Sequence, residues 1–184
     1  MLLAASDKAE LKGFGDGYIK LVTGVGPVLA AAQVSKAISE HRPDVVVSVG
    51  SAGSLGKLGL GEIVSFGSVV SSDQDLTFYH LPLGATLGPG RETIASLALD
   101  RSSRYVLVTS ARFADKRPDI PGDASDMEAY GVAMAARIHN VPCYAVKVIT
   151  DIVGERVSLS DYSRRLREWR SGLSLKVDEL IGSL

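Results

Sequence analysis

Two kinds of apolar pattern alternate along the chain and predict a series of strands and helices. Short continuous runs of aliphatic residues, such as DVVVSVG at residues 44–50, are typical of strands covered on both faces. Runs with apolar residues three or four positions apart are typical of amphipathic helices. We expect strands at residues 1–6, 18–26, 44–50, 61–72, 104–111 and 141–151, and helices at residues 27–40, 126–140 and 160–184. This alternation predicts an α/β fold with a mainly parallel central sheet.

The helices carry further signals. Pro27 stands in the first turn of the first helix, where its missing N–H costs nothing. The last helix has one apolar stripe, made of Tyr162, Leu166, Trp169, Leu173, Val177, Leu180 and Leu184. Residues 81–103, which contain LPLGATLGPGRE, are expected to form a loop or hairpin. A chain of 184 residues without a linker or repeat is expected to form a single domain, 1–184.

Composition and charge exclude several classes of protein. With 46% hydrophobic residues, 22% charged residues and a net charge of −1, the chain resembles an ordinary globular protein, and no basic run suggests nucleic acid or a membrane surface as a partner. The single cysteine, Cys143, excludes an intramolecular disulfide, and His41, His80 and His139 are too scattered to suggest a metal site. No apolar stretch reaches the roughly 18 residues of a membrane span, and the amino terminus lacks a signal-peptide pattern. We therefore expect a cytoplasmic protein.

The ends of the predicted strands are where a ligand is expected, because parallel sheets bind ligands beyond the carboxyl ends of their strands. Asp151 ends the strand at 141–151, and it is either a loop-starting residue or an acid at the mouth of a site. The small residues at 50–53 either form a tight turn or let backbone N–H groups approach a ligand. Phe113 is either a core residue or a platform for a flat ring. Because neither a Walker A motif nor a full dinucleotide fingerprint is present, no nucleotide cofactor and no dinucleotide-dependent oxidoreductase are expected.

The segment SDMEAYG permits two interpretations. Ser125 followed three residues later by Glu128 matches a capping box, in which Glu128 closes the start of a helix. Alternatively, Glu128 grips a vicinal diol through charge-assisted hydrogen bonds. Independently of this choice, Asp126 is expected in the first helical turn, where the helix dipole favours a negative charge. Spacing alone favours the capping box.

Five segments, in this order, carry a resemblance to a known family: VTGVGPVLAAA, RPDVVVSVGSAGSLG, LGLGEIV, SDMEAYGVA and VKVITD. Together they resemble the purine nucleoside phosphorylase/uridine phosphorylase superfamily, and within it most of all the 5′-methylthioadenosine/S-adenosylhomocysteine nucleosidases. The resemblance extends over residues 21–153. It implies a three-layer α/β/α sandwich, a mainly parallel (mixed) sheet and a nucleoside site shared across a homodimer.

The resemblance also implies an acid and a base for cleavage of an N-glycosidic bond. Asp151 corresponds to the general acid that protonates or hydrogen-bonds N7 of the purine. A purine is a poor leaving group unless it is protonated, and such an acid requires a raised pKa. The glutamate that activates water should follow the first strand, so Glu10 is expected in this role, with Asp7 as the alternative if the alignment slips.

The other implied positions bind the substrate. They are Glu128 at the ribose diol, Met127 under the sugar, Phe113 and Ala114 at the purine, Ser51 and Gly53 near the nucleophile, and Lys147 near the water and the catalytic glutamate. The walls around the 5′ substituent are expected from residues 76–90 and a neighbouring subunit.

Two departures from the family's pattern bear on the reaction. Lys147 replaces an arginine, which keeps the charge but loses the fork geometry, and Ser48 replaces the arginine with which phosphorylases commonly bind phosphate. We therefore expect water as the nucleophile and adenine as the released base. Three alternatives stay open: a phosphorylase that uses Lys147, Arg112 or Arg91 for phosphate, a futalosine-type hydrolase, and a nucleoside-binding protein without activity.

Overall fold

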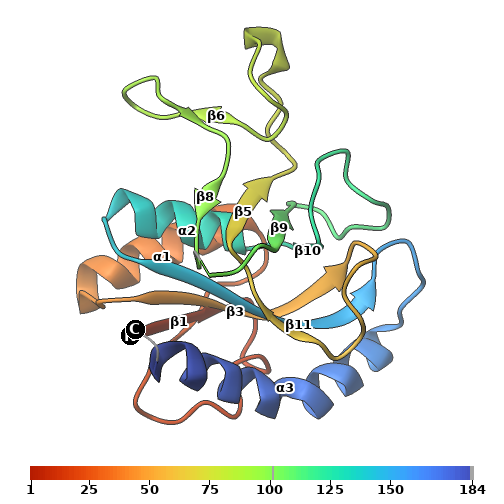
Figure 1. Cartoon of the computed structure of the whole chain (residues 1–184). Helices are drawn as coiled ribbons and strands as arrows, with labels where there is room; N and C mark the ends of the chain where they lie inside the picture. The colour runs from red at the N-terminus through yellow and green to blue at the C-terminus, as the bar shows by residue number, and fades with distance from the viewer. Residues whose placement is uncertain (101, 183–184) are drawn as a thin grey trace.

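A nine-stranded, mostly parallel sheet occupies the centre of the molecule (Figure 1). The computed structural model describes residues 1–100 and 102–182. The strands of this sheet are β1 (Leu2–Ala5), β2 (Ile19–Val22), β3 (Val46–Ser54), β4 (Ile63–Ser65), β5 (Ser68–Ser71), β8 (Leu97–Ala98), β9 (Val106–Thr109), β10 (Ala124–Asp126) and β11 (Cys143–Ile152). The long strands β3 and β11 run parallel along their whole length, from Cys143 beside Val46 to Ile152 beside Ser54.

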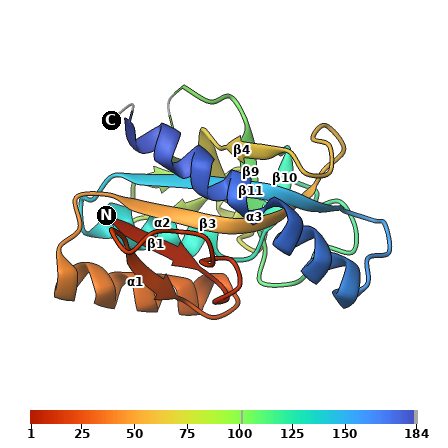
Figure 2. The same cartoon turned by 90° about the horizontal axis from the view of Figure 1, so that it is seen from below.

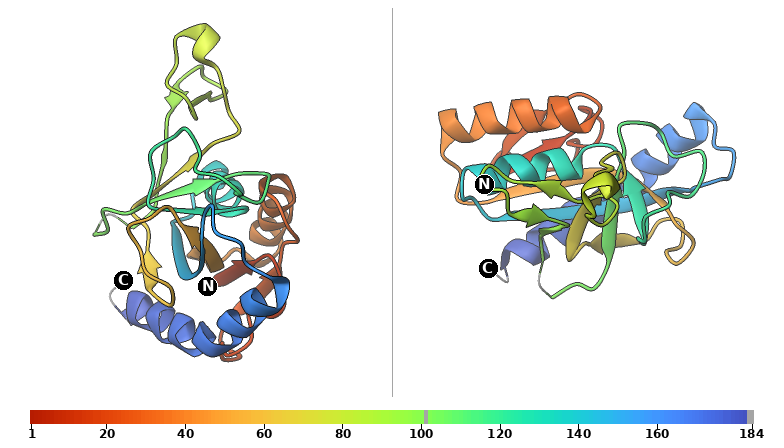
Figure 3. Two further views of the ribbon diagram at one scale, coloured as in Figure 1. Left: turned by 90° about the vertical axis from the view of Figure 1, so that its right-hand side faces the viewer. Right: turned by 90° about the horizontal axis from the view of Figure 1, so that it is seen from above.

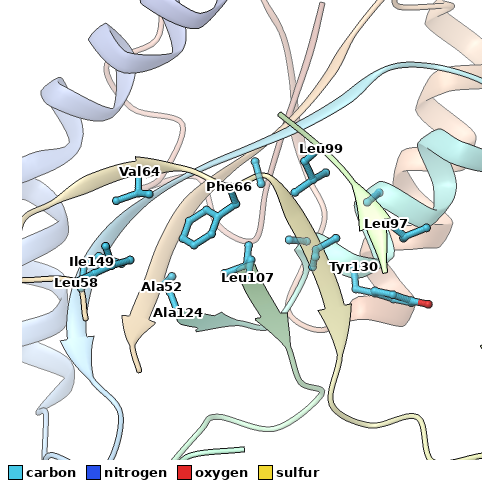
Figure 4. Close-up of a cluster of buried hydrophobic side chains, with 14 of the residues drawn as sticks. Ala52, Leu58, Val64, Phe66, Leu97, Leu99, Leu107, Ala124, Tyr130 and Ile149 are labelled. Carbon is cyan, nitrogen blue, oxygen red and sulfur yellow. The ribbon is translucent and has the colours of Figure 1, made fainter. Parts of the chain in front are cut away.

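One half of the sheet closes on itself. β3 pairs with β11, β11 pairs with β4, and after Phe66 and Gly67 the chain continues from β4 into β5. β5 then pairs with β9, β9 with β10, and β10 returns to β3 in an antiparallel pairing. Figure 4 shows Phe66, Leu107 and Ile149 gathered inside this circuit of strands, and all three are buried. The other half, β3–β1–β2, stays open.

Helices cover both faces of the sheet. α1 (Pro27–His41) and α2 (Ala129–Ile138) lie on one face, and α3 (Leu159–Gly182) lies on the other (Figures 1 and 2). Side chains of a strand point alternately to the two faces. Accordingly, Leu2 packs in the cluster under α1 and α2, whereas Leu3 packs with Leu173 and Val177 of α3. The predicted three-layer α/β/α sandwich is confirmed.

Most of the predicted elements are present with shifted boundaries, but the strand expected at 61–72 is divided into β4 and β5. The helix expected at 126–140 begins only at Ala129, because Asp126 belongs to β10. The last helix covers Leu159–Gly182, so Leu184 of the expected apolar stripe lies outside the described residues. Among the stripe residues, Leu166, Leu173 and Val177 are buried, as the spacing predicts.

An arm, defined here as residues 73–96, projects from the body of the molecule (Figure 1, and the left view of Figure 3). It contains the 3-10 helix Thr77–Tyr79 and a small hairpin of β6 (Thr86–Leu87) and β7 (Thr93–Ile94). The hairpin lies within residues 81–103, where a loop or hairpin is expected. Phe78 is 86% exposed and Tyr79 is 61% exposed. Two large aromatic side chains therefore lie on the surface of the arm.

Candidate active site

A cavity of about 400 Å³ lies at the carboxyl ends of β3 and β11. Seven of the nine site residues expected from the sequence line it: Ser51, Gly53, Phe113, Ala114, Met127, Glu128 and Asp151. The remaining two, Glu10 and Lys147, are almost completely buried behind its wall. Residues from β3, β11, the start of α2 and the loop after β9 therefore meet at one cavity, as expected for a parallel α/β sheet.

Asp151 reaches the cavity from a bulge in β11. The register against β3 shifts between Ile149 and Asp151, and such a bulge re-aims the side chains that follow it. The Thr150 hydroxyl donates to Asp151 Oδ1 at 2.9 Å, and a Cβ at Gly53 would lie 2.6 Å from Asp151 Oδ2. Burial raises the pKa of the Asp151 carboxyl, although the Thr150 bond and the positive charge of Arg165 oppose the rise. Asp151 therefore keeps its proton to a higher pH than an exposed aspartate.

Glu10 follows β1 and accepts four hydrogen bonds. Ser51 donates to Oε1 from its N–H at 2.9 Å and its hydroxyl at 3.0 Å, and Ser6 donates to Oε2 from its N–H at 3.0 Å and its hydroxyl at 2.8 Å. Gly50 has a φ of +139°, which favours glycine, and a Cβ there would lie 2.5 Å from Glu10 Oε1 and displace this carboxylate. Asp7, in contrast, is exposed and accepts the N–H of Ala9. Of the two acids expected here, Glu10 is the one that contacts the cavity wall.

Glu128 does not close a capping box. It is itself the N-cap residue of α2, and its Oε1 accepts the N–H of Gly26 at 2.9 Å. Ser125 pairs with Gly53 in the sheet and lies three residues before the N-cap, so its hydroxyl does not cap the helix, and Asp126 instead accepts the N–H of Ala129 at 3.0 Å. The capping-box interpretation was therefore wrong, because strand pairing overrides the local signal.

The carboxyl of Glu128 lies in an environment that favours its protonated form. Burial raises the pKa of Glu128 to about 7, and the negative charge of Asp126 adds to the rise. The positive charge of Lys147 and the Gly26 N–H oppose it. Glu128 is therefore expected to change charge near neutral pH.

Lys147 forms a buried ion pair beneath the cavity. Its Nζ lies 3.0 Å from Asp126 Oδ2 and donates to the Ser48 hydroxyl at 3.1 Å. Burial alone would lower the pKa of Lys147, but the negative charges of Asp126, Glu128 and Glu10 raise it. Positions 48 and 147, the two departures from the family's pattern, are thus bonded to each other. Asp126 is correspondingly a buried partner of Lys147 and not a residue of the first helical turn.

The cavity wall also contains residues that were not predicted as site residues. They are Ser6, Val25, Ala52, Ser125, Asp126, Val153, Val157, Ser158, Leu159 and Tyr162. Tyr162 belongs to the apolar stripe of α3, and its position at the start of that helix was the available signal. None of residues 76–90, which lie in the arm, is among the residues of this chain that line the cavity.

The described residues contain neither a metal-ion cluster nor a membrane-spanning helix. Within residues 1–100 and 102–182, no group of three or more His, Cys, Asp or Glu side chains is placed to hold a metal ion. No helix in the same ranges is long and apolar enough to cross a membrane.

The fold and the cavity define an α/β/α protein with a cavity at the carboxyl edge of its sheet. The chain belongs to the phosphorylase superfamily, whose sequence profile matches residues 14–181. The family predicted from the five sequence segments is therefore confirmed.

Several relatives within this family have a stated activity. The 5′-methylthioadenosine/S-adenosylhomocysteine nucleosidase of Geobacillus sp. (strain WCH70) is 28% identical over 170 residues, which cover 79% of this chain and 72% of that protein. The nucleosidase of the same name from Anoxybacillus flavithermus is 29% identical over 168 residues, with the same coverage.

Solved structures share the fold across the whole chain. The crystal structure of the Campylobacter jejuni 5′-methylthioadenosine/S-adenosylhomocysteine nucleosidase has a TM-score of 0.83 at 17% identity, and covers 100% of this chain and 98% of that one. A mutant of the Helicobacter pylori futalosine hydrolase has a TM-score of 0.84 at 16% identity, with the same coverage. At these identities, the similarity describes the fold alone.

Proposed function

We propose that the protein is a nucleosidase that hydrolyses the N-glycosidic bond of 5′-methylthioadenosine or S-adenosylhomocysteine and releases adenine in the cytoplasm. The observation that carries the proposal is a pair of carboxyl groups with different surroundings, Asp151 in the cavity wall and Glu10 behind that wall. Asp151 is buried with a raised pKa, whereas Glu10 accepts four hydrogen bonds, an arrangement suited to an ionised carboxylate. Carboxyl groups in such unequal environments serve as acid and base. The relatives named as nucleosidases support the same activity.

Each residue then has a chemical task. Asp151 donates its proton to the purine as the bond to the sugar breaks, so that the base leaves uncharged. Glu10 orients and deprotonates the water that attacks the sugar, whose charge resembles that of an oxocarbenium ion. Glu128 holds the ribose diol, Met127 lies under the sugar, and Phe113 stacks on the purine. Lys147 lies beneath the cavity, where its positive charge balances the negative charges of the buried carboxylates Asp126, Glu128 and Glu10.

Adenine release from 5′-methylthioadenosine is expected to proceed without phosphate and to yield free methylthioribose. Ser48 is 1% exposed and is bonded to Lys147, so neither residue presents a free phosphate ligand to the cavity. The measurement is base release from a panel of purine nucleosides with and without phosphate. Strict phosphate dependence with a ribose 1-phosphate product would instead make the protein a phosphorylase.

Futalosine belongs in the same panel because the fold does not distinguish the two hydrolases. The native futalosine hydrolase of Helicobacter pylori has a TM-score of 0.83, equal to that of the Campylobacter jejuni nucleosidase. Preferred cleavage of futalosine would leave the proposed roles of Asp151 and Glu128 unchanged, but it would assign a different 5′ substituent to the substrate. Binding of every nucleoside without any base release would favour a nucleoside-binding protein.

The KM for the nucleoside is expected to fall as the pH rises through about 7, because Glu128 must be ionised to accept hydrogen bonds from the diol. Its pKa is raised from 4.5 to about 7 in the folded protein, so the protonated form stabilises the fold. That stabilisation is complete below about 4.5 and is lost as the pH rises through about 7. Glu128→Gln should raise KM and remove its pH dependence. A KM that varies with pH equally in both proteins would refute this role.

The protein is expected to be a homodimer in which a partner subunit covers the arm. Phe78 and Tyr79 are exposed in the single chain, and large exposed aromatic side chains on a projecting segment indicate an interface. Replacing both with serine should produce a monomer in analytical ultracentrifugation and lower the activity. Leu175→Ser is the matched control, because Leu175 is 70% exposed on α3. A wild-type protein that is monomeric and fully active at micromolar concentration would contradict the assembly.

A further inference from the structure

The hydrogen bonds of Glu10 leave no position for a nucleophilic water. A carboxylate has about four acceptor positions, and Ser6 and Ser51 occupy all four in Glu10. Two of the donors are backbone N–H groups that cannot turn away, and two are hydroxyls that can rotate. For Glu10 to bind and activate a water, one of the two hydroxyls must release it.

The Ser51 hydroxyl has a second partner. Its Oγ lies 2.8 Å from the Tyr162 hydroxyl oxygen, and either oxygen can be the donor. In one arrangement Tyr162 donates to Ser51, and Ser51 donates to Glu10. In the other, Ser51 rotates to donate to Tyr162, and Glu10 Oε1 keeps only the N–H of Ser51. Because Ser51 and Tyr162 both line the cavity, the position released on Glu10 lies beside it.

Tyr162 is suited to accept this bond but not to act as a base. Burial raises the pKa of Tyr162 to about 12, and the negative charge of Glu10 adds to the rise, so the hydroxyl stays neutral at physiological pH. A neutral hydroxyl both donates and accepts hydrogen bonds. Tyr162 therefore supports both arrangements without gaining or losing a proton.

α3 holds Tyr162 in place and also reaches the acid. Tyr162 lies in the first turn of α3, and Leu173 and Val177 anchor the helix to the sheet. One turn of the helix after Tyr162, Arg165 donates to the carbonyl of Thr150 at 2.7 Å, directly before Asp151. The start of α3 thus contacts the surroundings of both catalytic carboxyl groups.

We propose that Tyr162 is a positioning residue: its hydroxyl accepts the hydrogen bond of Ser51 when water binds, and this frees Oε1 of Glu10 to orient that water. The inference rests on the proposed function, because it assigns a task within the hydrolytic step. No covalent bond forms or breaks in this step; one hydroxyl rotates.

The test is Tyr162→Phe, which keeps the ring and removes only the hydroxyl. Loss of one hydrogen bond predicts a kcat lower by roughly 3- to 10-fold, with KM within about two-fold of the wild type. Tyr18→Phe is the matched control, because the Tyr18 hydroxyl bonds Asp178 of the same helix and neither residue lines the cavity. It should leave both constants unchanged. A rise in KM that accounts for the whole loss would show that the hydroxyl contacts the substrate, which would overturn the proposal.

A double-mutant cycle with Ser51→Ala gives the decisive result. Without the Ser51 hydroxyl, Tyr162 has nothing to accept, so Tyr162→Phe should then change kcat by less than about two-fold. If Tyr162→Phe lowers kcat as much in the Ser51→Ala background as in the wild type, the proposal is overturned. A wild type without base release would instead refute the proposed function. In that case the hydrogen bond between Ser51 and Tyr162 can still be tested by thermal unfolding of the wild type, the two single variants and the double variant. If the Tm changes of the single variants simply add in the double variant, the two hydroxyls do not interact.

Discussion

Asp151→Asn is expected to lower kcat by roughly 10²–10⁴-fold while KM changes little. The substitution keeps the size and shape of the side chain but removes the proton that the purine must receive. Because that transfer develops in the transition state, its loss affects the rate more than substrate binding. Base release measured at saturating and at low substrate separates the two effects.

Two controls distinguish loss of the acid from damage to the fold. Asp123→Asn changes another buried carboxyl group, which is paired with Lys57 at 2.7 Å and lies outside the cavity wall. It should lower thermal stability without a comparable fall in kcat. A ribosyl substrate whose leaving group needs no proton should restore the rate of Asp151→Asn but not that of Glu128→Gln. Near-full activity of Asp151→Asn on 5′-methylthioadenosine would place the acid elsewhere.

The dependence of kcat on pH should follow the protonation of Asp151. Burial raises the pKa of Asp151, so the protonated acid persists to a higher pH than in an exposed aspartate. The kcat is therefore expected to decline as the pH rises through the pKa of this carboxyl, while KM improves through ionisation of Glu128 near pH 7. The two opposing effects predict a bell-shaped profile for kcat/KM.

The parts of the site that could be predicted from sequence are those at the ends of regular strands. Asp151 and Ser51 each follow a buried apolar run, and the topology of a parallel sheet brings such ends together. The sequence placed Glu10 before Asp7 as the base only through the resemblance. Local sequence could not make this choice, because two of the four hydrogen bonds that Glu10 accepts come from Ser51, which is 41 residues away, and the other two come from Ser6 in its own turn.

The parts that could not be predicted depend on contacts distant in sequence. The ion pair of Lys147 with Asp126 and its bond to Ser48 join three separate strands, so no local pattern reveals them. The capping-box spacing at Ser125 was misleading for the same reason, since pairing with β3 takes that segment into the sheet. Tyr162 was predicted only as a member of the apolar stripe of the last helix. The spacing of apolar residues does not indicate which group the Tyr162 hydroxyl contacts.

Glu10→Gln is expected to reduce kcat by roughly 10²–10⁴-fold, because the amide can neither deprotonate water nor carry the negative charge. The substitution also affects stability. Whichever way the amide turns, its NH₂ group faces a backbone N–H, either of Ser6 or of Ser51. Such an unsatisfied buried donor costs about 1–3 kcal/mol, so thermal unfolding must be measured with the kinetics.

Two further variants, Asp7→Asn and Glu10→Ala, decide which of the two residues is the base. Asp7 is exposed and bonds only within its own turn in the described structure, so Asp7→Asn should retain activity within a few-fold of the wild type. Glu10→Ala leaves a space beside Ser51, and added formate is expected to restore part of its activity by supplying a carboxylate there. Formate should not restore Asp151→Asn, whose missing function is a proton donor. If Asp7→Asn is the inactive variant and Glu10→Ala retains its rate, the four hydrogen bonds of Glu10 serve the fold alone, and the base lies at the exposed turn.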